Sequence, residues 1–388
     1  MLSRKDIEAL EEKILAPYAM KSRDTSGREF AEPPHESRTC YQRDRDRIVH
    51  SEAFRKLEYK TQVFIIFEGD YYRTRLTHTI EVAQIARTIG RNLRLNEDLI
   101  EAIALAHDLG HPPFGHAGEE ILNQIMKSRG LKGFNHNKRS FDIVTQFEKR
   151  YPTFYGLNLT REVLIGILKH KTIYDVPQAV KGSLKDGPTL EAQVVDIADS
   201  LAYLNHDIDD GLTSGCITEE DLMDSVLWRR VLKDIQQTLK SSEREMLKYQ
   251  IVKSLIDQQV KDLLKTSDAK IKKQKLRSAQ QVKNLHKRFI AFSEQMSRER
   301  DQLQGLLNEK LYHHYRVERM TSKAKRIIFD LFEAYEKNLK QLPYSIYDRN
   351  KKYSPKEKIE VICNHIAGMT DRSALDEHKR LFNPYEKV

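Results

Sequence analysis

Residues 107–116 read HDLGHPPFGH and combine three histidines and an aspartate with two prolines and two glycines. Imidazole and carboxylate groups bind divalent metal ions, and imidazole also transfers protons near neutral pH. Proline fixes the backbone φ angle and glycine permits tight turns, so this stretch should follow a rigid path that leaves a helix. The spacing therefore predicts a chemical site at the end of a helix.

Further candidate residues lie on the apolar faces of predicted helices. His78 lies four residues before Val82, and Asp199 lies four residues after Val195, so both should face inward. Burying an unpaired carboxylate costs several kcal/mol, which means that Asp199 needs a partner. Three more polar residues, Tyr203, His206 and Asp207, follow on nearly the same helical face as Asp199.

Four of these residues form a mixed nitrogen and oxygen ligand set, namely His78, His107, Asp108 and Asp199. Such a set suits a divalent ion, with Mn, Mg, Fe, Co, Ni and Zn all open, and leaves positions for water and substrate. A competing interpretation is structural, because a single histidine on an apolar stripe is usually a hydrogen-bonded core residue. If Asp199 is not a ligand, Asp196 is the next candidate.

The elements that must position these side chains are mainly helices. Apolar periodicity predicts a helix over residues 76–93 and another that starts after Asn96 as its N-cap. The second helix is apolar nearly all round, which indicates a central buried position. We expect Gly110 to form its C-terminal cap.

The remaining chain predicts an all-α fold with a small β-hairpin near residues 60–75 and a helical C-terminal half. A helix should start at residue 190 and end at Gly211, and Thr218 should cap the next one. We expect residues 1–215 to form the catalytic core with an N-terminal helical arm. Residues 216–388 should pack on it, so that both parts make one globular unit.

The composition narrows the class of protein. The chain has 388 residues, 39% of them hydrophobic and 32% charged, which is typical of a helix-rich globular protein. It contains no apolar run of about 18 residues and no signal-peptide core, so no membrane span is expected. Three widely separated cysteines argue against a disulfide framework and favour a cytoplasmic location.

The net charge of +9 is concentrated in residues 261–290, which contain ten Lys or Arg residues against two Asp. Such a segment can bind nucleic acid or another polyanion, although a solvated helical face explains it equally well. Phe289 is its one aromatic residue, whereas proteins that bind single strands use several. We therefore interpret the segment as a regulatory or intersubunit surface.

The ligand pattern resembles the HD superfamily of metal-dependent phosphohydrolases. The stretches HDLGHPPFGHAGE, FNHNKRSF, ADSLAYLNHDIDDG and IAGMTDRSALDEHKRLF resemble the bacterial deoxyguanosine triphosphate triphosphohydrolase family. That family is in turn similar to the animal HD nucleotidase. The resemblance runs from about residue 35 to the C-terminus and is weakest over residues 220–310.

The resemblance implies metal-dependent hydrolysis of dGTP or several deoxynucleoside triphosphates to deoxynucleoside and inorganic triphosphate. Water activated by the metal would attack the α-phosphorus. His116 would act as general acid at the 5′-oxygen, oriented by Glu119, and His136 would lie along the phosphates.

The resemblance also assigns substrate contacts. The expected phosphate-binding residues are Arg75, His111 and Lys169, and the expected sugar-binding residues are Gln62, Tyr203 and Asp207. One position departs from the animal enzyme, because Ser200 replaces a phosphate-binding lysine. Lys169, Arg319, Arg372 or a neighbouring subunit would then supply the missing charge.

The expected partners are a dNTP substrate, a dNTP activator at a second site, single-stranded nucleic acid and further copies of the chain in a tetramer or hexamer. Two alternatives stay open. One is another HD phosphohydrolase that acts on (p)ppGpp, nucleoside monophosphates or single-stranded nucleic acid. The other is a nucleic-acid-binding regulator with a structural metal.

Overall fold

The computed structural model describes residues 1–62, 72–170, 186–238, 244–348 and 351–387, whose regular secondary structure is almost entirely helical. The all-α prediction is confirmed. The hairpin predicted near residues 60–75 lies largely outside the described residues. Of its flanks, Thr61 and Thr74 form an isolated antiparallel bridge.

The first half of the chain contains nine helices among its described residues: α1 (Arg4–Ile14), α2 (Cys40–Val49), α3 (Glu52–Lys56), α4 (Arg75–Asn92), α5 (Glu97–Ala106), α6 (Gly115–Ser128), α7 (His136–Asp142), α8 (Arg161–Leu168) and α9 (Leu190–Ser214). The second half continues with α10 (Glu219–Leu222), α11 (Val226–Thr238), α12 (Arg244–Gln274), α13 (Ala279–Leu285), α14 (Glu294–Leu307), α15 (Tyr315–Lys337), α16 (Pro355–Ala367) and α17 (Asp371–Phe382). Short 3₁₀ turns lie at Ser22–Asp24, Leu57–Tyr59 and Leu339–Gln341, and π-helical turns at Ile143–Phe147 and Asn308–Tyr312.

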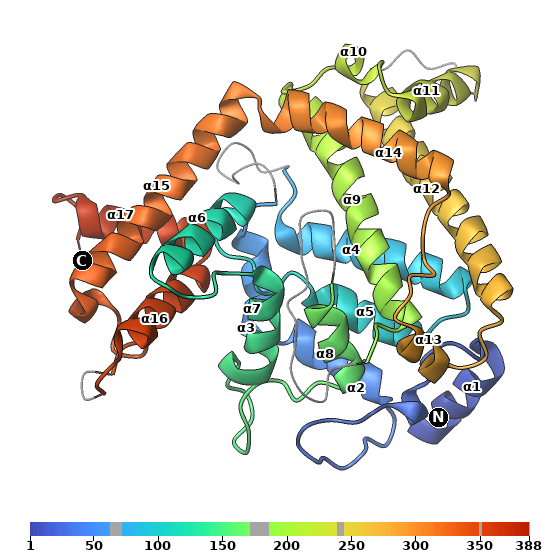
Figure 1. Cartoon of the computed structure of the whole chain (residues 1–388), viewed down its shortest axis with the longest axis horizontal. Coiled ribbons are helices and arrows are strands. Elements are labelled where there is room, and N and C mark those ends of the chain that lie inside the picture. The colour runs from blue at the N-terminus through green and yellow to red at the C-terminus, as the bar shows by residue number, and fades with distance from the viewer. Residues whose placement is uncertain (63–71, 171–185, 239–243, 349–350, 388) are drawn as a thin grey trace.

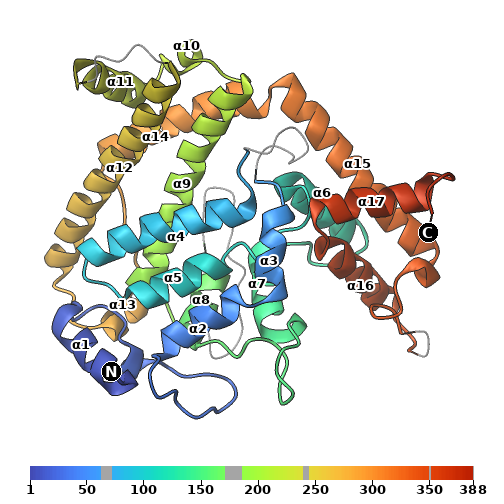
Figure 2. The same cartoon turned by 180° about the vertical axis from the view of Figure 1, so that it is seen from behind.

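Helices α4, α5 and α9 cross at the centre of the molecule and pack on one another (Figure 1). Helices α12 and α14 lie beyond α9 at one end, whereas α6, α15, α16 and α17 gather at the other end (Figure 2). The largest hydrophobic cluster joins α4, α5 and α9 with apolar residues of α12 and the segment after it. None of the described helices combines the length and apolar character that a membrane crossing requires.

The predicted start of α5 is confirmed, because the Asn96 side chain accepts a hydrogen bond from the backbone N–H of Leu99. Thr218 likewise caps α10, where its hydroxyl and Asp221 form a capping box. Both caps satisfy backbone donors that the first helical turn leaves unpaired.

The two predicted glycine caps are wrong. Helix α5 ends at Ala106, and Gly110 lies beyond it in a turn that presses against α7. A Cβ atom on Gly110 would lie 2.1 Å from the His136 carbonyl oxygen, so glycine is needed there for close approach. Helix α9 runs past Gly211 to Ser214, and Gly215 supplies the left-handed cap with φ +68°.

Substituting Gly110→Ala should lower the free energy of unfolding by about 1–3 kcal/mol, because the added methyl group forces α7 away from the turn. Gly305→Ala is the matched control, since nothing lies within 4 Å of a Cβ at that helical position. The control should be neutral or stabilise the protein by about 0.5–1 kcal/mol. Denaturant titration of both variants measures the difference, and equal values would contradict the packing role of Gly110.

Candidate functional site

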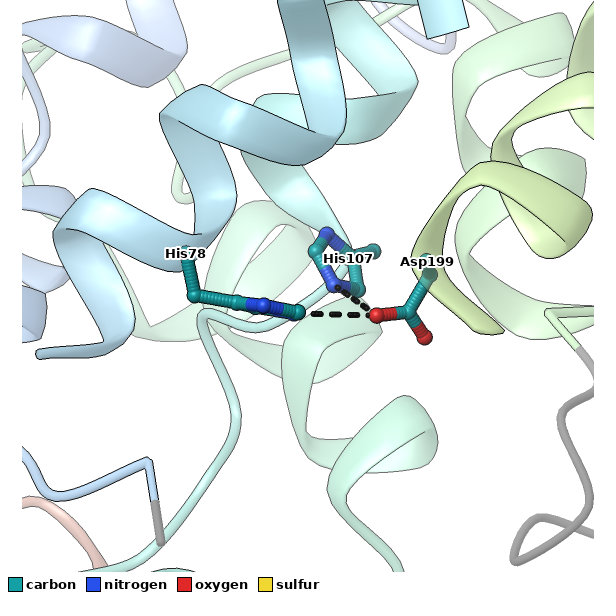
Figure 3. A group of neighbouring side chains, drawn as sticks. All are labelled: His78, His107 and Asp199. Atoms are coloured by element: carbon teal, nitrogen blue, oxygen red, sulfur yellow. Dashed lines mark hydrogen bonds and ion pairs between the residues drawn. The ribbon is translucent and has the colours of Figure 1, made fainter. Parts of the chain in front are cut away.

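Three of the predicted ligands converge in the core from three different helices. His78 comes from α4, His107 directly follows α5 and Asp199 comes from α9 (Figure 3). The His78 Nε2 atom lies 2.9 Å from Asp199 Oδ1, and His107 Nε2 lies 3.7 Å from the same oxygen. One donor atom from each residue fits within 4.8 Å of the others. The arrangement is a compact set of nitrogen and oxygen donors around one point.

Asp108, the fourth predicted ligand, lies at the edge of this set. Its Oδ1 lies 3.4 Å from His107 Nε2, and its Oδ2 accepts a hydrogen bond of 2.9 Å from Arg75 Nη1. Burial alone would raise the pKa of Asp108, but His107, Arg75 and His111 hold it well below its usual range. The carboxylate is therefore ionised and able to bind a cation.

The chemistry of the donors fits a divalent metal. His107 Nδ1 lies 2.6 Å from the Ala104 carbonyl oxygen and donates to it, which leaves the lone pair on Nε2. That Nε2 atom is buried and has no hydrogen-bond partner in the described part of the chain. A buried polar atom without a partner is costly, and a metal ion would satisfy it. Two imidazoles and two carboxylates suit several first-row metals.

A second layer of polar residues orients Asp199. Its Oδ2 lies 3.1 Å from His170 Nε2, and His170 Nδ1 lies 2.8 Å from Asp196 Oδ1. Asp196 Oδ2 in turn accepts from Arg288 Nη2 at 2.9 Å. Burial opposes a charge on His170, but the two carboxylates raise its pKa well above its usual range. The His170 ring therefore contacts both carboxylates and links Asp199 to Asp196.

Sequence reasoning missed both His170 and Arg288. It named the neighbouring Lys169, whose ammonium donates to the Asp186 carbonyl, and it placed Arg288 in the basic surface segment 261–290. A buried histidine at the end of an apolar helix was the one signal that could have found His170. Nothing local marks Arg288, because its role depends on a contact between distant segments.

A second cluster extends from Asp108 toward the surface. His111 Nε2 lies 3.1 Å from Asp108 Oδ1, and the rings of His111 and His136 stack with centroids 3.8 Å apart. The His116 ring lies edge-on to His111 at 5.8 Å and its side chain is 41% exposed. The three histidines therefore form a row that begins at the candidate metal set and reaches solvent.

Glu119, expected to orient His116, makes its closest contacts with His136. Its Oε2 lies 2.9 Å from His136 Nδ1, and its Oε1 accepts from the His136 backbone N–H at 2.9 Å. The distance from Glu119 Oε2 to His116 Nδ1 is 4.0 Å. Burial would raise the pKa of Glu119, but the three neighbouring histidines lower it, with His136 foremost.

The turn that carries His116 is held from the C-terminal end of the chain. Phe114 adopts φ +63° ahead of α6, and its N–H donates to Asp371 Oδ1 at 2.8 Å. The other Asp371 oxygen accepts from the backbone N–H of Thr61, which precedes Gln62. One buried carboxylate of α17 thus fixes both the histidine turn and the predicted sugar-binding segment.

The predicted sugar-binding residues lie beside this row. The Tyr203 ring is 6.0 Å from the His116 ring, and the buried Asp207 accepts a hydrogen bond from the Tyr312 hydroxyl at Oδ2. Burial raises the pKa of Asp207 well above its usual range. Gln62 lies near Arg75, because both border Gly115 at the start of α6.

Ser200, which stands in place of the animal lysine, and two of the candidate replacement cations each have contacts within the chain. Ser200 accepts from the buried Arg300 through its carbonyl and hydroxyl oxygens, at 3.2 and 3.1 Å. Arg319 packs on the Tyr315 ring, and Arg372 is 76% exposed beside Asp376 on α17. The contact between Arg300 and Ser200 was not foreseen, since the two residues are far apart in sequence.

His78 has its own outer partners on α4 and α9. Its Nδ1 lies 3.2 Å from His206 Nδ1, and His206 Nε2 contacts the Glu81 carboxylate. Burial lowers the pKa of His206 to about 4, so the ring is neutral at physiological pH. Arg73 and His206 lower the pKa of Glu81 against the opposing effect of burial, so this carboxylate is ionised.

Two sequence families match the chain. The HD domain matches residues 75–204, which contain all four candidate ligands, and the phosphohydrolase-associated domain matches residues 290–380. The second match covers Tyr312 and Asp371, which contact the site from the C-terminal half. The matches show that the chain contains an HD domain and a phosphohydrolase-associated domain.

Curated relatives match over nearly the whole chain. A deoxyguanosinetriphosphate triphosphohydrolase-like protein of Geobacter metallireducens is 49% identical over 96% of each chain. A protein of the same description from Geobacter sulfurreducens is 47% identical over 100% of both chains. Another, from Ralstonia pickettii, is 48% identical over 95% of this chain and 94% of its own. The chain therefore belongs to the deoxyguanosinetriphosphate triphosphohydrolase-like family of HD-domain proteins.

Proposed function

We propose that the protein hydrolyses deoxynucleoside triphosphates to deoxynucleoside and inorganic triphosphate. The reaction uses a divalent metal held by His78, His107, Asp108 and Asp199. The observation that carries the proposal is the unpartnered, buried His107 Nε2 beside the Asp108 and Asp199 carboxylates. When bound, the metal acts as a Lewis acid that polarises a phosphoryl oxygen and activates water.

Arg75 and His111 bind the phosphates in this proposal. Arg75 uses Nη1 on Asp108, while its buried Nε and Nη2 have no hydrogen-bond partner in the described ranges. A phosphate oxygen would satisfy these donors, since guanidinium groups bind phosphate well. His111 Nδ1 is also buried without such a partner, and a nearby anion would favour a proton on it. Lys169 is a further phosphate candidate, turned toward Asp186 in this structure.

Asp207, Tyr203 and Gln62 bind the sugar. Tyr312 occupies Asp207 Oδ2, and the buried Oδ1 is without a hydrogen-bond partner among the residues described. That oxygen, together with the similarly unpartnered Gln62 Oε1, can accept a hydrogen bond from a sugar hydroxyl. A wall of packed side chains at this point would exclude a 2′-hydroxyl.

His116 serves as the general acid that protonates the 5′-oxygen as the bond to the α-phosphorus breaks. Its position at the solvent end of the histidine row, beyond His111, lets it approach the substrate from another side than the metal ligands. Glu119 and His136 form the adjacent pair that keeps the row in place, with Glu119 acting mainly on His136.

The proposal extends to the assembly. Residues 1–215 and 216–388 act as one globular unit, which the shared hydrophobic cluster and the contacts of Arg288 support. We further propose a cytoplasmic homo-oligomer, a tetramer or hexamer, that a second dNTP activates. The exposed lysines of segment 261–290 provide a regulatory or intersubunit surface that can also bind a polyanion.

The substrate class is tested with all four dNTPs, singly and in pairs, and with GTP, in Mg²⁺ and in Mn²⁺. We expect release of inorganic triphosphate from at least one dNTP or dNTP pair and a clear preference for dGTP over GTP. A folded, metal-loaded protein that hydrolyses none of the dNTPs would overturn the proposed reaction. Equal turnover of dGTP and GTP would refute the proposed sugar site alone.

Asp199→Ala should abolish metal binding and activity together, because it removes a ligand and leaves the His170 charge without one of its carboxylates. Elemental analysis of the purified variant measures the metal, and thermal unfolding shows whether the chain is folded. Full metal occupancy in Asp199→Ala would show that Asp199 is not a ligand and would direct attention to Asp196.

His116→Ala should keep its metal and its affinity for dNTP but lose about 10²–10⁴-fold in kcat, the usual contribution of a general acid. Glu119→Ala should lose less. The measurement compares kcat, nucleotide affinity and metal content in one preparation of each variant. A near-normal kcat for His116→Ala, or loss of its metal, would show that His116 is not the acid.

A further inference from the structure

The two candidate histidine ligands differ in what holds Nδ1, the ring nitrogen that faces away from the Asp199 carboxylate. In His107 this nitrogen donates to a backbone carbonyl, that of Ala104. In His78 it lies 3.2 Å from Nδ1 of a second histidine, His206, with the two rings nearly perpendicular at 85°. His206 lies two helical turns beyond Asp199 on α9 and is buried on the same face.

The Glu81 carboxylate, which lies on the far side of His206 from His78, determines where the protons lie along this contact. The Glu81 carboxylate accepts hydrogen bonds, so the His206 nitrogen that contacts it, Nε2, is the one that carries a proton. In this tautomer His206 Nδ1 has a lone pair and accepts a hydrogen bond from the His78 Nδ1–H group. His78 in consequence has its lone pair on Nε2, the atom that faces Asp199.

Glu81 is held in place by a charged network between α4 and α9. Arg73 Nε donates to Glu81 Oε2 at 3.1 Å, and Arg73 Nη1 contacts Asp210 Oδ1 at 2.7 Å and Asp209 Oδ2 at 2.9 Å. The carboxylate that dictates the proton positions is thus anchored to the same two helices that carry His78 and Asp199.

We propose that His206, oriented by Glu81, is a positioning residue that fixes the ring tautomer of His78 and thereby sets the affinity of the metal site. This inference rests on the proposed function, since it requires that His78 is a metal ligand. Groups that hold the outer nitrogen of a ligating histidine typically contribute 10- to 100-fold in metal affinity. The metal ligands themselves do not include His206.

The test compares two substitutions at residue 206 in the full chain. The Asn side chain of His206→Asn places its amide oxygen near the position of Nδ1 and can accept from His78. His206→Leu fills similar space but accepts no hydrogen bond. Titration of the metal-free proteins with Mn²⁺ alone, monitored by electron paramagnetic resonance, gives the dissociation constants. We expect His206→Leu to bind Mn²⁺ about 10- to 100-fold more weakly and His206→Asn to bind within a few-fold of the unchanged protein.

A purely structural role for His206 would lower the thermal stability of both metal-free variants and would not separate them by metal affinity. Glu81→Leu provides a second route if His206→Leu does not fold, because Glu81 is 41% exposed. It should weaken Mn²⁺ binding in the same direction. Unchanged Mn²⁺ affinity in the folded Leu variants would overturn the inference.

His78→Ala separates this inference from the proposed function. If His78→Ala still binds Mn²⁺ as the unchanged protein does, the proposed metal site itself is wrong. If His78→Ala loses Mn²⁺ while His206→Leu retains it, the metal site stands and only the role of His206 is refuted.

Discussion

Two ionised carboxylates buried inside a helical core impose the main physical constraint on this protein. Asp108 and Asp199 are 3% and 8% exposed, at the crossing of α4, α5 and α9. Such charges are stable in a protein interior only with paired charges or a metal nearby. Arg75 and His170 supply part of the compensation, and a divalent ion at the proposed ligand set would supply the rest. The surrounding helices are arranged to make these pairings possible.

The compensation draws on parts of the chain far from the ligands. Arg288 reaches Asp196 from the segment after α13, Tyr312 reaches Asp207 from a π-helical turn, and Asp371 holds the Phe114 turn from the start of α17. Unusual π-helical turns often occur at functional sites, and this one aims a hydroxyl at a buried carboxylate. The C-terminal half therefore completes the site and does more than cover it.

Much of this arrangement could be predicted from sequence. The all-α class, the Asn96 cap and the inward orientation of His78 and Asp199 follow from local pattern, because helical periodicity records which face is buried. The ends of α5 and α9 could not be placed, since Gly110 and Gly211 serve close packing where the pattern favoured caps. The contacts of Glu119 likewise could not be predicted from local spacing. Its spacing to His116 on one helix suggested a pair, whereas the structure brings His136 closer from another element. The contacts of Arg288 and Arg300 join segments far apart in the chain, and no local sequence pattern marks them.

Helix α9 carries Asp199, Tyr203, His206 and Asp207 within about two turns, so that a proposed metal ligand, the histidine that contacts His78 and the proposed sugar contacts share one rigid helix. Each residue added to a helix rotates all later side chains by about 100° around its axis. An insertion or deletion of one residue between Asp199 and Asp207 would turn one group into the core and the other away from it. Natural variation in length among related chains should therefore spare this stretch and collect in the loops that flank α9, where a change of length leaves the helical register intact.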